Sequence, residues 1–239
     1  MSSNKLRLNI DKTKFMWIGT TKALRSLQDH KKPVLDLGVL LDHELSMNNY
    51  ITDLCRKCFY QLRRIKCIRR SLTPDSVKTL VHSFVCSKVD YCNVVLYGTK
   101  FLNFGCIQSV LNAAARLIAG VPKFQSISTY VHDDLHWLQV GERIDFKIAL
   151  IVRDCLMGEG PDYLQELVKP VSEIFGRKHL RSSNHGDLVV TSHKTEKYGK
   201  RRFLMSSAKI WNGLPVQLKT IDVENREMFK KRLKHHLFN

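Results

Sequence analysis

Basic side chains gather in residues 56–70, a stretch whose apolar residues recur at helical spacing. Seven cations fall within these fifteen residues, and the nearest acidic residue upstream is Asp53. The cations are Arg56, Lys57, Arg63, Arg64, Lys66, Arg69 and Arg70. Guanidinium and ammonium groups arrayed along one helix can follow the phosphates of a nucleic acid. We predict a nucleic-acid-binding face here; the alternative is an ordinary solvated face of a helix in a basic protein.

Two shorter basic clusters carry a weaker form of the same argument. The first consists of Lys200, Arg201 and Arg202, and the second of Lys230, Lys231, Arg232, Lys234, His235 and His236. Short basic runs also resemble nuclear-localisation signals, although such matches often arise by chance.

The whole chain shares this bias in charge. Its 239 residues contain 39 Lys and Arg against 22 Asp and Glu, a formal charge of +17. An excess of this size attracts polyanions, nucleic acid first and anionic membranes second. The sequence lacks the apolar stretch of a signal peptide at its start and any run of roughly 20 apolar residues. We expect an intracellular chain, in the nucleus or cytoplasm, that does not contact membrane; the alternative is a basic amphipathic helix lying on anionic lipid.

Several cysteines and histidines have spacings that suggest metal ligands. Cys55 and Cys58 form a C-x-x-C pair, yet a helical pattern runs through them without the tight loops of a structural zinc site. His132 and His136 are four residues apart, but no glutamate follows His132 as in a zinc-protease helix. We expect buried, reduced thiols and no metal. Trp137 and Trp211 lie in apolar patterns and are expected in the core, with stacking on nucleobases as the alternative.

The pattern of apolar residues predicts a mainly α chain with a short β N-terminus. Leu6, Leu8 and Ile10 alternate with polar residues, and residues 15–18 form an apolar run, which together predict a pair of strands. A second strand-like segment covers residues 33–45, with Gly38 inside it and a turn at residues 42–43.

Helical periodicity follows in three stretches. The first begins at Ser46 as N-cap, the second begins at Thr73 and Pro74 and ends at Gly98, and the third covers residues 103–119. We expect a three-helix bundle over 46–120, after a β region over 1–45. Residues 121–239 are expected to be a mostly helical extension with basic loops around 176–202.

Eight segments in this order resemble a known family. They are KLRLNIDKTKFMWIG, LDLGVLLDHELSM, LVHSFVCSKVDYCNVVLYG, NAAARLI, LHWLQVGERIDFK, HLRSS, IWNGLP and FKKRLKHHLF. Together they resemble the C-terminal part of the reverse transcriptase of LINE-type, jockey-like non-LTR retrotransposons, over essentially the whole chain.

The resemblance implies a role for each region. Residues 1–45 would be the end of the polymerase palm, with Lys12 near the incoming nucleotide and Leu37, Gly38 and Val39 in a primer-grip hairpin. The three helices would be the thumb, and the remainder a C-terminal extension. The alternatives are a solvated turn lysine at Lys12 and a simple edge hairpin at residues 37–39.

The carboxylates that would hold two Mg²⁺ ions in this family lie upstream, partly in a Tyr-x-Asp-Asp turn, and are missing from this sequence. Residues 130–135, YVHDDL, have one residue too many and lack flanking strands, so Asp133 and Asp134 are not expected to bind catalytic metal. We therefore expect a truncated polymerase whose Met1 is an internal methionine, without cofactor or polymerase activity.

We expect such a fragment to retain binding of RNA and DNA, as a template–primer duplex or a single strand. The alternative is a non-catalytic interaction protein or a decayed reading frame. In that case the uncovered N-terminal hairpin would be covered by a partner or by self-association.

Overall fold

The computed structural model describes residues 9–20, 22–24, 33–99, 101–174, 176, 185–192, 195–220 and 225–238. Within them the protein is mainly helical, with one short two-stranded sheet near the N-terminus. The chain divides into two compact units, residues 1–56 and residues 57–239. The boundaries expected near residues 45 and 120 fall inside these units and stay predictions.

Unit 1 begins with a 3-10 turn, η2 (Ile10–Lys12), capped by the side chain of Asn9. The strand predicted at residues 15–18 is wrong, since residues 13–20 have no regular structure. Phe15 is 86% exposed and Trp17 56% exposed. An apolar run forms an inner strand only where neighbouring strands cover it, and no strand pairs with it among the described residues. Leu6 and Leu8 lie outside these residues.

A hairpin follows, made of β1 (Val34–Asp36) and β2 (Val39–Leu41). Asp36 faces Val39, so Leu37 and Gly38 are the two residues of the turn rather than the interior of one strand. Both have positive φ, +43° and +85°, as a two-residue turn that matches the right-handed twist of the strands requires. Gly38 thus belongs to the turn between the strands and not to a strand.

Asp42 organises the chain just before the first long helix, α1 (Asn48–Ile68). Its carboxylate oxygens accept hydrogen bonds from the backbone N–H groups of Ser46 and Met47, with N–O distances of 2.8 Å. They also accept one from the N–H of Glu44 at 3.1 Å. Burial opposes ionisation of Asp42, but these bonds and one from the Ser46 hydroxyl outweigh it and lower the pKa. The hydroxyl of Ser46 accepts the backbone N–H of Asn48, the first residue of α1, at 3.3 Å, and Asp42 holds the turn that leads into the helix.

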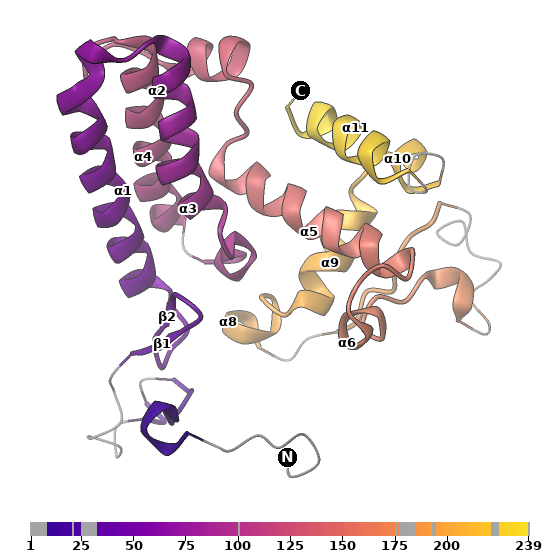
Figure 1. Ribbon diagram of the computed structural model, residues 1–239. Helices are drawn as coiled ribbons and strands as arrows, with labels where there is room; N and C mark the ends of the chain where they lie inside the picture. The colour runs from indigo at the N-terminus through magenta and orange to yellow at the C-terminus, as the bar shows by residue number, and fades with distance from the viewer. Residues whose placement is uncertain are drawn as a thin grey trace. The chain divides into compact units, whose positions relative to one another are not determined.

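Unit 2 continues α1 from residue 57 and adds η3 (Arg69–Ser71), α2 (Pro74–Val81), a π-helical turn η4 (His82–Cys86), α3 (Ser87–Asp90) and α4 (Phe101–Ala119). In Figure 1, α3 continues the line of α2, and α4 runs beside α2. As predicted, Thr73 caps α2 and Pro74 is its first residue. The predicted end at Gly98 is wrong: α3 ends at Asp90, and Cys92 has a φ of +50° before the 3-10 turn η5 (Asn93–Leu96).

The remaining helices pack around α5 (Val140–Leu156). This helix begins with a capping box formed by Gln139 and Glu142. The other elements are the π-helical turn η6 (Tyr130–Asp134), α6 (Asp162–Gln165), η7 (Val171–Glu173), α8 (Glu196–Gly199), α9 (Phe203–Asn212), α10 (Val216–Thr220) and α11 (Arg226–Phe238). Helix α5 contacts α9 and α11, as Figure 1 also shows. Trp211 stacks on Phe229, and both are fully buried.

As predicted, the described part of residues 121–239 is mostly helical. None of the helices in the described residues combines the length and hydrophobicity that crossing a membrane would require.

Candidate nucleic-acid interface

The C-terminal half of α1 has one buried face and one cationic face. Cys58, Leu62 and Ile65 are buried, and their spacing of three and four residues places them on one stripe. The exposed cations of this half of the helix are Lys57, Arg63, Arg64 and Lys66. Lys57 and Arg64 are seven residues apart, so they lie on the same side about 10 Å from each other along the axis. The structure thus places Lys57 and Arg64 side by side, whereas Lys66 lies half a turn around the helix from Lys57.

An aromatic side chain lies among these cations. Tyr60 is 57% exposed, and Cζ of Arg64 lies 5.9 Å from the centroid of its ring. Aromatic rings between basic groups are typical of surfaces that stack nucleobases and neutralise phosphates. Sequence reasoning missed Tyr60, although its position three residues after Lys57 and four before Arg64 places it on this face.

Arg56 precedes this group on the same helix, in unit 1. Its Nη2 lies 2.6 Å from Oδ1 of Asp53, one turn earlier. The Arg56 side chain is largely exposed, and ion pairs at exposed positions stabilise weakly. A phosphate can therefore compete with Asp53 for this guanidinium.

Arg69 and Arg70 differ although they are adjacent in sequence. Arg69 donates from Nε to the carbonyl oxygen of Leu117 at 3.1 Å and from Nη2 to that of Ile118 at 3.3 Å. These carbonyls belong to the last turn of α4, which has no partners for them within the helix. Arg70 is exposed. Of the seven predicted cations, Arg69 is thus bound to the fold, whereas Arg70 is presented to solvent.

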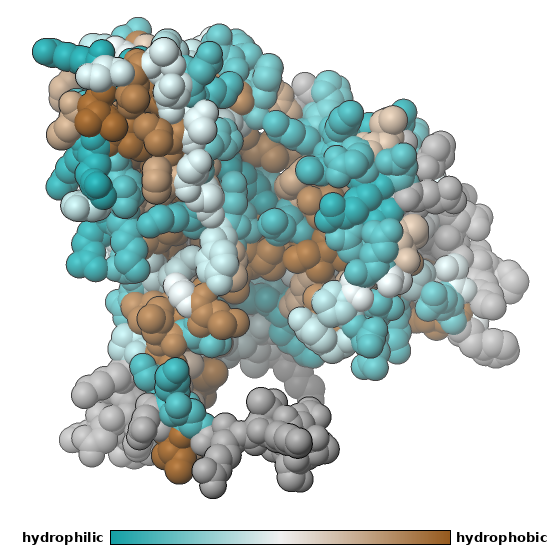
Figure 2. Space-filling model, viewed as in Figure 1, coloured by the Kyte–Doolittle hydropathy of each residue, from teal (hydrophilic) through white to brown (hydrophobic). Residues whose placement is uncertain are grey.

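The other predicted site residues lie in unit 1. Lys12 is exposed on the 3-10 turn. In the hairpin, Leu37 is 84% exposed, Gly38 is exposed and Val39 is buried. Figure 2 shows apolar side chains at the surface around β1 and β2.

The two shorter basic clusters lie in unit 2. Arg201 donates to the carbonyl oxygens of Tyr97 at 3.2 Å and Val95 at 3.4 Å, so it joins η5 to the segment before α9. A pocket of about 550 Å³ lies beside it, lined by Tyr97, Gly98, Val190, Lys200, Arg201, Met205, Lys209 and Asn212. On α11, Lys230, Lys231 and Lys234 are exposed, and the surface over this helix is largely hydrophilic in Figure 2.

The cysteines expected to be buried thiols are partly so. Burial raises the pKa of Cys58 to about 11 and that of Cys86 to about 12, so both are protonated at neutral pH. Cysteine binds a metal ion as the thiolate. No group of three residues able to hold a metal occurs in the described part of the chain, and Asp133 and Asp134 are exposed on η6. Trp137 and Trp211 are buried, as the core interpretation predicted.

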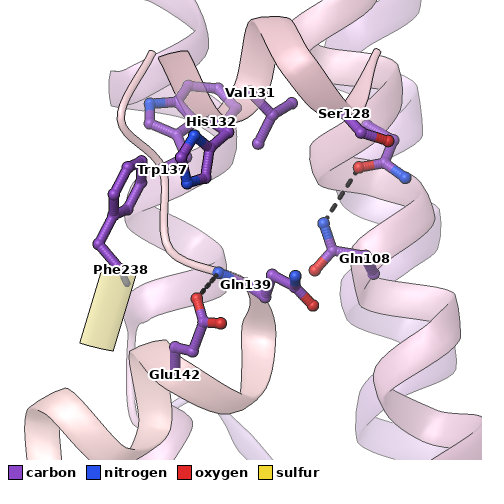
Figure 3. Close-up of a pocket in the computed structure, with 9 residues that line it drawn as sticks. Gln108, Ser128, Val131, His132, Trp137, Gln139, Glu142 and Phe238 are labelled. Carbon is purple, nitrogen blue, oxygen red and sulfur yellow. Dashed lines mark hydrogen bonds between the residues drawn. The ribbon is translucent and has the colours of Figure 1, made fainter. Parts of the chain in front are cut away.

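A second pocket, of about 260 Å³, opens between α4, η6, α5 and the end of α11 (Figure 3). Several of its polar groups bind one another. Gln108 donates from Nε2 to Oδ1 of Asn112 at 3.0 Å, and the backbone N–H of Gln139 donates to Oε2 of Glu142 at 2.7 Å. These bonds satisfy groups that a ligand would otherwise use.

His132 lies on the other side of this pocket. Its Nδ1 is 2.5 Å from Oδ1 of Asp133, and its ring stacks on Phe238 with centroids 4.1 Å apart. The hydrogen bond to Asp133 raises the pKa of His132. Ser128 lines another part of the pocket (Figure 3), and no hydroxyl or thiol among the described residues is hydrogen-bonded to His132. The pocket therefore lacks the paired nucleophile and base of covalent catalysis.

In comparisons with known proteins, no family model, curated protein or solved structure matches the chain.

Proposed function

We propose that this protein binds nucleic acid through the outer face of α1 in unit 2. The observation that carries the proposal is the set of exposed cations around Tyr60. Among the described residues, no carboxylate forms an ion pair with Arg63, Arg64 or Lys66. Like charges held together without counter-charges repel one another, and a polyanion relieves that repulsion.

The resemblance to LINE-type reverse transcriptases extends this proposal. We propose that the chain corresponds to the palm end, thumb and C-terminal extension of such an enzyme. In this proposal it binds RNA and DNA as a template–primer duplex. It would do so inside the cell, in the nucleus or cytoplasm. The order of the eight segments supports this assignment. The carboxylates for Mg²⁺ would belong to an upstream palm, so we expect no polymerisation by this chain alone.

The salt dependence of binding tests the proposal. Five phosphate contacts, from Lys57, Arg63, Arg64, Lys66 and Arg70, would give a slope of about −4.5 for log affinity against log salt on B-DNA. Replacing Arg63 and Arg64 by Ala together should weaken binding and flatten the slope by about two units. Fluorescence anisotropy of a labelled duplex at several salt concentrations measures both.

A matched control removes two exposed cations elsewhere in unit 2. Lys147 lies on α5 and Lys169 follows α6, and both are exposed. The double variant Lys147→Ala, Lys169→Ala has the same net charge as the arginine variant and should keep the wild-type slope. An unchanged slope in the arginine variant, or an equal change in the control, contradicts the assignment to α1.

A non-catalytic interaction protein is the second candidate, because unit 1 exposes several large apolar side chains. Leu35 and Leu37 on the hairpin are exposed, as are Phe15, Trp17 and Ile18. Sedimentation with and without a duplex separates the two functions. The interaction protein would form oligomers and leave the duplex unbound.

A further inference from the structure

A tight turn after α4 presents an exposed aromatic ring beside a cation. Phe124 is 95% exposed, the highest value for a large apolar side chain among the described residues. Nζ of Lys123 lies 5.8 Å from the centroid of its ring. A single exposed apolar side chain is common on protein surfaces, so the surroundings of this one decide what it can do.

The turn is anchored to the helix that precedes it. Gly120 ends α4 with a φ of +73°, and the N–H of Gln125 donates to the carbonyl oxygen of Pro122 at 3.2 Å, closing the turn around Lys123 and Phe124. Nε of Arg116, on α4, donates to the carbonyl oxygen of Gln125 at 3.1 Å. The Phe124 ring is therefore carried by a short braced turn.

The same end of unit 2 carries the end of the basic segment. Arg69 is bonded to the last turn of α4, and its Nη2 is 3.8 Å from where a Cβ on Gly120 would lie. Phe124 is four positions after Gly120, which limits their Cα distance to about 14 Å. Arg70 follows Arg69 directly and is exposed. Phe124 thus lies within a few nucleotides' reach of the cations that follow α1.

Tyr60 with Arg64 and Phe124 with Lys123 are two cation-paired, exposed aromatic rings in one unit. Bases inside a duplex are stacked on one another and are not open to a protein ring, whereas unpaired bases can stack on one. An aromatic platform near phosphate-binding cations is typical of single-strand recognition.

We propose that Phe124 is a stacking platform for an unpaired nucleobase, and that Lys123 and Arg70 bind the phosphates beside it. This inference rests on the proposed function of α1 and specifies its ligand. The protein should prefer a strand that continues beyond a duplex as a single-stranded overhang.

Three labelled probes test the inference on the full chain: a blunt duplex, the same duplex with a six-nucleotide overhang, and that overhang duplex with abasic sites in place of the unpaired bases. Phe124→Ala should weaken binding of the overhang probe by about 10-fold or more, as expected for loss of one stacked base. Its affinity for the blunt and abasic probes should stay within about two-fold of wild type. Phe124→Trp should restore binding of the overhang probe.

Tyr163→Ala is the matched control, because Tyr163 on α6 is 69% exposed. It should leave all three affinities unchanged. Equal losses on the blunt and overhang probes, no loss with Phe124→Ala, or a loss that persists on the abasic probe would each overturn the inference. If the Arg63, Arg64 variant changes the salt slope while Phe124→Ala changes nothing, only the stacking site fails. If the wild-type chain binds no probe, the proposed function fails as well.

Discussion

Nε of Arg69 donates a hydrogen bond to the carbonyl oxygen of Leu117, 48 residues later, at 3.1 Å. With the second bond to Ile118, this guanidinium satisfies two carbonyls at the C-terminal end of α4. A positive charge there also complements the helix dipole. Arg69 therefore ties the end of α1 to the end of α4.

Arg69→Ala should lower the free energy of unfolding by about 1–2 kcal/mol, because hydrogen bonds to a charged group are lost at a half-buried position. The salt slope of duplex binding should not change. Arg70→Ala is the neighbouring control, and it should leave stability within about 0.5 kcal/mol while flattening the slope by about one unit. Urea unfolding followed by circular dichroism, together with anisotropy, measures both effects. The reverse assignment of the two residues would contradict this division of roles.

Asp42 should make the start of α1 sensitive to acid. Its pKa is lowered in the folded chain, so its contribution is present above the ordinary value of 3.8 and is lost as the pH falls through the folded value. Hydrogen exchange of the Ser46 and Met47 amides should stay slow to below pH 3.8 and then accelerate beyond the intrinsic trend. Asp42→Ala should expose these amides at every pH, at a cost of about 1–2 kcal/mol for the lost hydrogen bonds to a carboxylate. Equal protection in the variant would show that the carboxylate does not hold this turn.

The cysteines should divide into reactive and unreactive groups. With a pKa of about 11 for Cys58 and about 12 for Cys86, thiolates are scarce at pH 8, and both side chains are buried. Cys67, Cys92 and Cys106 are exposed. A short iodoacetamide pulse followed by peptide mass spectrometry should modify these three first. In urea all cysteines should react alike, so selective labelling of Cys58 in the folded chain would contradict the buried placement.

Lys219 and Asp187 form an ion pair that should be costly to break on one side only. Nζ of Lys219 lies 2.6 Å from Oδ1 of Asp187, and the two side chains are 3% and 19% exposed. Lys219→Ala leaves a mostly buried carboxylate without this partner and should destabilise unit 2 by about 3 kcal/mol. Lys219→Met combined with Asp187→Leu should cost less than Lys219→Ala alone, because it removes both charges. Urea unfolding of Lys219→Met, Asp187→Leu and the double variant completes the cycle, and additive losses would show that the two side chains do not interact.

The helices of unit 2 were predictable because their signals are local. The apolar stripe of α1, the Thr73 cap with Pro74, and the stop at Gly120 each act within one or two turns of the chain. The early end of α3 was not predictable. It is followed by a positive φ at Cys92, and cysteine is not a residue type that indicates a turn. The apolar run at 15–18 predicts a strand that does not form, because local patterns do not reveal whether neighbouring strands exist to pair with it.

The candidate site shows the same limit. Helical spacing correctly predicted exposure of Arg63, Arg64 and Lys66. It could not separate Arg69 from Arg70, because the partner of Arg69 is a helix end 48 residues away. Phe124 carried no periodic signal, since its exposure follows from a turn rather than from a helix face.

The turn of the hairpin in unit 1 combines an unfavourable backbone conformation with an exposed apolar side chain at Leu37. Leucine is poorly suited to a φ of +43°, whereas asparagine followed by glycine is the preferred pair for this turn. Leu37→Asn would therefore reduce the backbone strain at residue 37. The same substitution would remove an exposed apolar side chain from the turn. We expect this variant to self-associate less than the wild-type chain, while its basic surface stays unchanged.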